Sequence, residues 1–101
     1  MTQDDDKIEI LNPDPAKKGA RVDRATYEVY RAAVLAAIPV GEEGIALADL
    51  SDAVVPHVDP AVLERAPVGW WVMAAKLDLE ARKVIERVPG KGRQRLRHAT
   101  T

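Results

Sequence analysis

The chain contains no cysteine and no phenylalanine, and its 101 residues include only two histidines and four aromatic residues. Without cysteine it can form neither a disulfide nor a thiolate metal site, and it has no cysteine nucleophile. A catalytic zinc ion would depend on His57, His98 and carboxylates, so we expect no metal and no other cofactor. No run of about 18 apolar residues is present and the first residues are acidic, so we expect neither a membrane span nor a secretory signal, and a cytoplasmic protein.

The composition is that of one soluble folded domain. Hydrophobic residues make up 47% of the chain and charged residues 31%, with a net charge of -1, and a second core would not fit in this length. The charges are segregated: residues 39–64 carry six acidic residues and no lysine or arginine, whereas residues 82–98 carry seven basic residues and one acidic residue. This asymmetry favours a charged partner for the C-terminal region, or contact between the oppositely charged segments within or between chains.

The order of elements follows from apolar periodicity and from the positions of proline, glycine and capping residues. Asp23 is expected to cap the first helix, which Pro39 ends, and Asp59 to cap a short helical turn. We expect a single domain between a short lead and a short tail. The predicted parts, in chain order, are a disordered acidic lead over 1–7, an edge strand over 7–11, a loop over 12–22, helices over 24–38 and 45–55, a helical turn over 60–65, a third helix over 67–82, strands over 84–88 and 93–98, and a tail over 99–101, with the domain spanning 8–98.

The last two strands are expected to form an antiparallel hairpin with residues 89–92 as its loop. With that loop, Ile85 lies opposite Leu96 and Glu86 lies opposite Arg95. The two apolar residues then share one face of the hairpin. A register shift by one residue would place them on opposite faces. The other face carries three arginines of the last strand: Arg93, Arg95 and Arg97.

Three helices followed by a hairpin is the element order of a winged helix, a helix-turn-helix variant with a β wing. The segment KLDLEARKVIERVPGKGRQRLRH resembles the end of the third helix and the wing of bacterial winged-helix regulators. Across residues 8–98, the motifs ILNP, RVD, PHV and GWW also resemble a family of small uncharacterised bacterial proteins of winged-helix type. The resemblance implies an α+β, winged-helix-like fold with three main helices, a C-terminal two-stranded wing and a short N-terminal strand, and it implies no reaction.

Two features depart from the usual DNA-binding version of this fold. Ala46 stands where a threonine or serine commonly caps the second helix, and the third helix begins VGWWVMAA instead of presenting polar side chains to the major groove. The second helix and its flanks are also acidic, so phosphates would be repelled there. The acidic residues concerned are Glu42, Glu43, Asp49, Asp52 and Asp59.

The strongest signal for nucleic-acid binding is the wing. Alternate residues of a strand point to the same side and lie about 6.7 Å apart, so several arginines of the last strand could contact phosphates at once. The alternative is a solvated edge strand whose charges prevent aggregation and in which Arg95 pairs with Glu86. The predicted phosphate contacts are Arg87, Lys91, Arg93, Arg95 and Arg97.

The adjacent tryptophans of the third helix point about 100° apart and cannot both enter one core pocket. Trp70 is in register with Ala74, so we expect Trp70 to pack inside. Trp71 and Met73 are then available for a protein interface, unless the N-terminal strand and the 12–22 loop cover Trp71.

No catalytic constellation is present in the sequence. Two histidines without a glycine-framed serine or an HExxH pattern do not suggest triad or metal chemistry, and PGKGR lacks the spacing of a phosphate-binding loop. We therefore expect a non-enzymatic domain that binds nucleic acid through its basic wing. The alternative is a protein-interaction or homodimerisation module that uses the tryptophan-rich third helix and does not bind DNA. Neither function involves a membrane or a small-molecule substrate.

Overall fold

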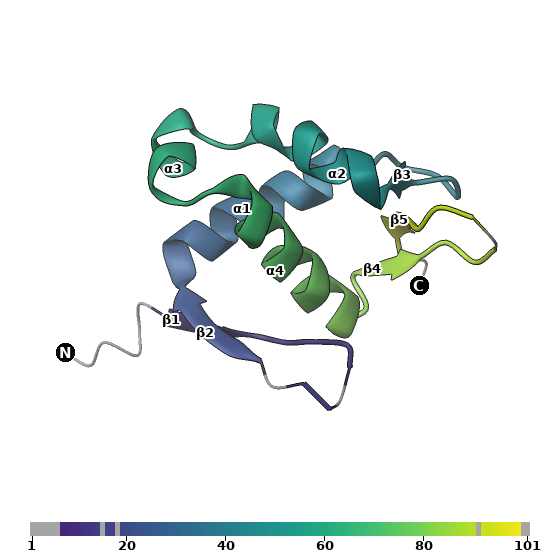
Figure 1. Cartoon of the computed structure of the whole chain (residues 1–101), viewed down its shortest axis with the longest axis horizontal. Coiled ribbons are helices and arrows are strands. Elements are labelled where there is room, and N and C mark those ends of the chain that lie inside the picture. The colour runs from purple at the N-terminus through teal and green to yellow at the C-terminus, as the bar shows by residue number, and fades with distance from the viewer. Residues whose placement is uncertain (1–6, 15, 18, 91, 100–101) are drawn as a thin grey trace.

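Helices occupy the centre of the computed structural model, which describes residues 7–14, 16–17, 19–90 and 92–99 (Figure 1). The fold is mixed α+β, as predicted, and small antiparallel sheets flank the helices. In chain order the elements are β1 (Lys7–Ile10), β2 (Ala20–Asp23), α1 (Arg24–Ala37), β3 (Ile45–Ala46), α2 (Leu47–Val54), the 3-10 helix η2 (Val55–His57), α3 (Pro60–Arg65), α4 (Val68–Ala81), β4 (Ile85–Arg87) and β5 (Arg95–His98).

The sheets bring together segments that are far apart in the sequence. β1 pairs with β2 as an N-terminal hairpin, and β3, β5 and β4 form a three-stranded sheet in that order. In the latter sheet Ile45 pairs with Leu96, which joins the strand before α2 to the last strand of the chain. Figure 1 shows the N-terminal hairpin below α4 and the three-stranded sheet at the right of the molecule.

The first helix forms as its sequence predicts. The side chain of Asp23 accepts hydrogen bonds from the hydroxyl and the backbone N–H of Thr26, and these bonds lower the pKa of the Asp23 carboxyl. An apolar stripe, with residues spaced three and four apart, is buried against α4 and α2. Its members are Tyr27, Tyr30, Val34 and Ile38.

Two predicted boundaries are wrong because strand pairing overrides local pattern. Residues 20–22 were expected to end the 12–22 loop but belong to β2 (Ala20–Asp23), because this segment pairs along its whole length with β1. Ile45–Ala46 forms β3 instead of the first turn of the second helix, since both residues pair with β5. Lys7, where the predicted lead and the predicted strand over 7–11 overlap, begins β1 as the strand prediction has it, and residues 1–6 lie outside the described residues.

β4 and β5 form the predicted hairpin, but their register differs from the prediction by two residues. Ile85 lies opposite His98 instead of opposite Leu96. The backbone N–H of Val88 donates to the carbonyl of Arg95, so the turn is two residues longer than predicted. A shift of two residues leaves every side chain on its predicted face, because side chains alternate with period two. Ile85 and Leu96 are accordingly both buried.

A buried carboxylate on α4 connects the N-terminal hairpin to the helices. Asp78 is fully buried, and its side chain accepts hydrogen bonds from the Leu11 backbone N–H at 2.8 Å and from the Tyr27 hydroxyl. Arg82 donates to the same carboxylate at 2.9 Å and also to the carbonyl of Glu9 in β1 at 3.1 Å. Burial, followed by the hydrogen bond to Asp78, raises the pKa of Tyr27 well above its ordinary value.

The Asp78→Ala variant should lose about 3 to 5 kcal/mol of the free energy of unfolding, because one change leaves three donors without their buried acceptor. Urea denaturation followed by far-ultraviolet circular dichroism measures the loss. The control is Asp52→Ala, an exposed acidic residue of α2, which should stay within about 0.5 kcal/mol of the wild type. A loss below about 1 kcal/mol for Asp78→Ala would show that this carboxylate does not hold the hairpin to the helices.

Candidate functional site

Two of the predicted wing arginines hold the three-stranded sheet to the turn that precedes β3. Arg95 Nε donates to the backbone carbonyl of Glu43 at 2.8 Å, and Arg97 Nη1 donates to that of Glu42 at 3.4 Å. Arg97 also pairs with Glu86 at 2.6 Å, whereas the predicted register placed Glu86 opposite Arg95. The difference follows from the two-residue shift in register, which puts Glu86 opposite Arg97.

The other predicted phosphate contacts lie in different surroundings. Arg87 Nε pairs with Glu80 at 2.9 Å, although 59% of the Arg87 side chain remains accessible. Arg93 is exposed in the turn before β5, and Lys91 lies outside the described residues. The structure thus brings Arg95 and Arg97 together in one groove but leaves Arg93 apart from them. A role for any of these residues in binding phosphate stays a prediction.

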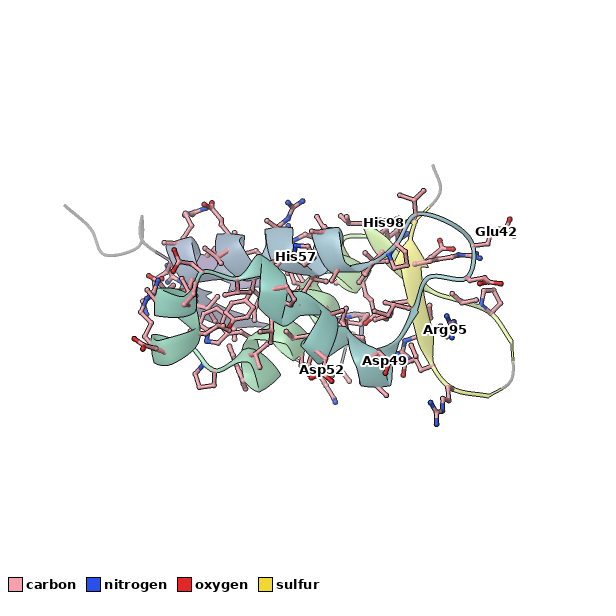
Figure 2. All side chains as sticks on the ribbon, turned by 90° about the horizontal axis from the view of Figure 1, so that it is seen from above. Glu42, Asp49, Asp52, His57, Arg95 and His98 are labelled. Atoms are coloured by element: carbon pink, nitrogen blue, oxygen red, sulfur yellow. The ribbon has the colours of Figure 1, made fainter. Side chains whose placement is uncertain are left out.

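The face of the molecule that α2 forms carries exposed acidic residues, and further acidic residues are exposed on the flanking segments. Figure 2 shows Asp49 and Asp52 projecting from α2 on the same side, with Glu42 at the end of the molecule that carries Arg95. The six acidic residues of segment 39–64 are all exposed. A phosphate backbone that approached this face would be repelled.

The two tryptophans are placed the opposite way from the prediction. Trp71 is half-buried, and its ring stacks on Tyr30 with the centroids 5.8 Å apart. Trp70 is 56% exposed and meets Trp71 edge-on at a centroid distance of 5.2 Å. The helix face that carries Trp70, Ala74 and Leu77 borders the N-terminal hairpin, whereas Trp71 stacks on Tyr30 of α1.

An apolar surface remains uncovered on the outer side of α4. Trp70, Met73 and Leu77 follow one another at spacings of three and four residues, which places them on one face of the helix. Met73 is 41% exposed, and Leu11 of the N-terminal hairpin lies beside this face and is also exposed. We call these four residues the α4 surface; they border a pocket of about 190 Å³ between the helix and the hairpin.

Gly19 allows the two sides of the N-terminal hairpin to approach each other closely beside this pocket. A Cβ atom at Gly19 would lie 2.1 Å from the carbonyl oxygen of Ile10, so no other residue could stand there without moving the chain. The pocket wall that faces α4 is formed by Ile10, Leu11, Asn12, Gly19 and Ala20. The segment 66–75, which provides Trp70 and Met73, contains no charged residue.

The described residues contain no group of three or more histidine, aspartate or glutamate residues arranged to hold a metal ion. His57 is exposed in η2, whereas His98 Nε2 lies 2.8 Å from the carbonyl oxygen of Ile38. Figure 2 shows the two histidines on different elements of the molecule. No helix in the described part of the chain is long and apolar enough to cross a membrane.

The arrangement of elements defines a small mixed α+β domain with an exposed apolar helix face. A family model described as a family of unknown function (DUF6958) matches residues 7–96, and the chain belongs to this family. The predicted membership in an uncharacterised family is thereby confirmed, while the winged-helix type and the bacterial origin stay predictions. No curated protein and no solved structure matches the chain.

The Trp71→Ala variant should lose about 3 kcal/mol of the free energy of unfolding, because it opens a cavity beside Tyr30. Trp70→Ala should lose less than about 1 kcal/mol, since more than half of its side chain already contacts water. Urea denaturation measures the free energy of unfolding of both variants and of the wild type. If Trp70→Ala proves the more destabilising change, the assignment of Trp71 to the core is wrong.

Proposed function

We propose that this domain is a winged helix that binds another protein through the α4 surface instead of reading DNA. The winged-helix assignment is supported by the element order β3, α2, α4, β4, β5 and by the sheet order β3, β5, β4. The observation that carries the function is the exposure of Trp70 and Met73 on α4. This is the helix that a DNA-binding winged helix would present to the major groove, where polar side chains are needed.

The chemistry of the α4 surface is that of the centre of a protein interface. Aromatic residues and methionine are enriched there, whereas charged residues are depleted, and tryptophan is among the residues whose truncation most weakens binding. Trp70 and Met73 match this pattern, and the uncharged segment 66–75 surrounds them. A partner that covered both side chains would remove their apolar area from water, at about 25 cal/mol per Å².

The shape of the surface favours a helix as the partner. The apolar side chains run along α4, and the pocket between α4 and the hairpin runs beside them. A helix with apolar residues at positions i, i+3 and i+7 can place one side chain in such a groove and pack the others along Trp70 and Met73. We therefore propose a partner that presents the apolar face of a helix.

Nucleic-acid binding is the second candidate, and the exposure of Arg93 and Arg87 favours it. Two observations weigh against it. Arg95 and Arg97 would have to leave backbone carbonyls in order to reach phosphates, and the exposed Glu42 and Glu43 line the same groove as these arginines. Two of the predicted phosphate contacts are therefore already engaged within the chain, and affinity for nucleic acid depends on the number of such contacts.

A salt titration against random duplex DNA separates the two candidates. We expect no binding tighter than about 100 µM at about 50 mM salt, because Arg95 and Arg97 are held by backbone carbonyls and the acidic residues beside them repel phosphates. Fluorescence anisotropy of a labelled duplex makes the measurement. Micromolar binding would assign the function to the wing instead, particularly if Arg93→Ala reduced the slope of log affinity against log salt by about 0.9.

A library of helical peptides displayed on phage tests the protein-binding function directly. Selection on the immobilised protein should enrich peptides with an apolar face, and Trp70→Ser should weaken their binding at least about tenfold. Val40→Ser is the matched control, because Val40 is 96% exposed and lies outside the α4 surface. Selected peptides that bind both variants equally well, or a selection that enriches no helix, would exclude the α4 surface as the binding site.

A further inference from the structure

A pocket of about 440 Å³ lies between the end of α4 and strand β4, and it shares no lining residue with the pocket at the α4 surface. Its volume falls within the range of roughly 300 to 1,000 Å³ that is typical of small-molecule sites. Pro13, Ile85 and Ala99 provide apolar walls, and the other lining residues are charged. We call this cavity the β4 pocket.

A buried ion pair of α4 adjoins the β4 pocket. Lys76 Nζ lies 3.0 Å from Glu80 Oε2, one helical turn further on, and only 3% and 7% of the two side chains are accessible. Because both charges have lost their contact with water, such a pair contributes little to stability compared with two apolar side chains of similar size. Glu80 also lines the β4 pocket, so the pair is placed to act on the groups around it.

Glu80 holds the guanidinium of Arg87 at the pocket. Arg87 Nε donates to Glu80 Oε1 at 2.9 Å, while 59% of the Arg87 side chain remains accessible. Within the described residues, neither Nη group of Arg87 donates a hydrogen bond. A guanidinium fixed through Nε presents these remaining N–H groups in a planar fork, which matches the two oxygens of a carboxylate.

Lys83 provides a second cation to the β4 pocket. It follows α4 in the left-handed conformation, with φ of 63°, and its side chain is exposed. In the part of the chain that the structure describes, this side chain forms no ion pair. An ammonium group on a flexible stem can adjust to a bound anion, whereas the guanidinium of Arg87 is held in place. The pocket thus combines one fixed and one adjustable cation.

The charges around the β4 pocket do not cancel. Lys76 balances Glu80, and Arg97 balances the remaining acidic residue of the wall, Glu86, through the ion pair at 2.6 Å. Two cations are therefore left in excess beside the apolar walls. These cations are Lys83 and Arg87.

We infer that the β4 pocket binds a small organic carboxylate, whose charged group contacts Arg87 and Lys83 and whose apolar body lies against Pro13 and Ala99. Apolar walls favour such a ligand over an inorganic anion. The carboxylates of Glu80 and Glu86 in the wall disfavour an anion with two charges. This site goes beyond the proposed function and is independent of it, since the two pockets have no residue in common.

Titration of the full chain with benzoate, followed by the NMR shifts of its backbone amides, tests the inference. Benzoate should bind saturably with a Kd of about 1 to 10 mM and should shift the amides of residues 83–87. Benzamide has the ring without the charge and inorganic phosphate has charge without the ring, so each should bind at least about tenfold more weakly. Benzoate that does not saturate by about 100 mM, or that binds no better than either control, would overturn the inference.

Removal of single cations tests which residues contact the anion. Lys83→Gln and Arg87→Gln should each weaken benzoate binding about three- to tenfold. Arg93→Gln is the matched control, because it removes the same charge from an exposed turn residue that does not line the pocket. It should leave the Kd within about twofold of the wild type. Equal weakening by all three changes would assign the effect to the net charge of the domain and would overturn the pocket as the site.

Replacement of the buried pair tests whether Glu80 positions Arg87. The double variant Lys76→Met with Glu80→Leu keeps the net charge and should be at least as resistant to urea as the wild type, because apolar side chains replace both buried charges. Its affinity for benzoate should nevertheless fall at least about threefold, since Arg87 loses the acceptor that fixes its guanidinium. A folded double variant that binds benzoate as well as the wild type would overturn this positioning role. If the double variant does not fold, Lys83→Gln and Arg87→Gln still decide whether the pocket is the site.

Discussion

The hydrogen bonds to the Asp78 carboxylate determine where the N-terminal hairpin lies. A charge without access to water is tolerated only when donors surround it, and here the donors come from the chain after β1, from α1 and from α4 itself. The carboxylate therefore joins three parts of the chain at one point. This junction places Leu11 beside Trp70 and Met73, so the α4 surface and its pocket exist only when the hairpin is docked.

The sequence pattern predicts those parts of this fold that depend on interactions between residues close together in the chain. The caps at Asp23 and Asp59 depend on neighbours two or three residues away, and both form. Alternation along a strand fixes the face of each wing residue but not its partner, so the burial of Leu96 was predictable while the register was not. Strands β2 and β3 show no pattern of their own, because each is stabilised by a strand that comes from elsewhere in the chain.

The candidate site was harder to predict for two physical reasons. The first half of α4 is apolar on nearly every side, so periodicity could not decide which of Trp70 and Trp71 faces the core. The partners of Arg95 and Arg97 include backbone carbonyls, which every residue possesses and which sequence therefore cannot mark. Two arginines of the basic wing, Arg95 and Arg97, thus anchor the turn before β3 in the fold.

The segregation of charge along the sequence is only partly balanced within the folded chain. Arg95 and Arg97 reach the turn of residues 42–44 but bind its carbonyls, so the carboxylates of Glu42 and Glu43 remain exposed. Binding that depended on these outer charges would weaken steeply with salt, as phosphate binding does. Contact through the α4 surface would respond differently, because its centre is uncharged and salt screens only the pairs at its rim. Ionic strength therefore distinguishes an apolar partner from a charged one, because salt screens contacts between charges and leaves contact between apolar side chains in place.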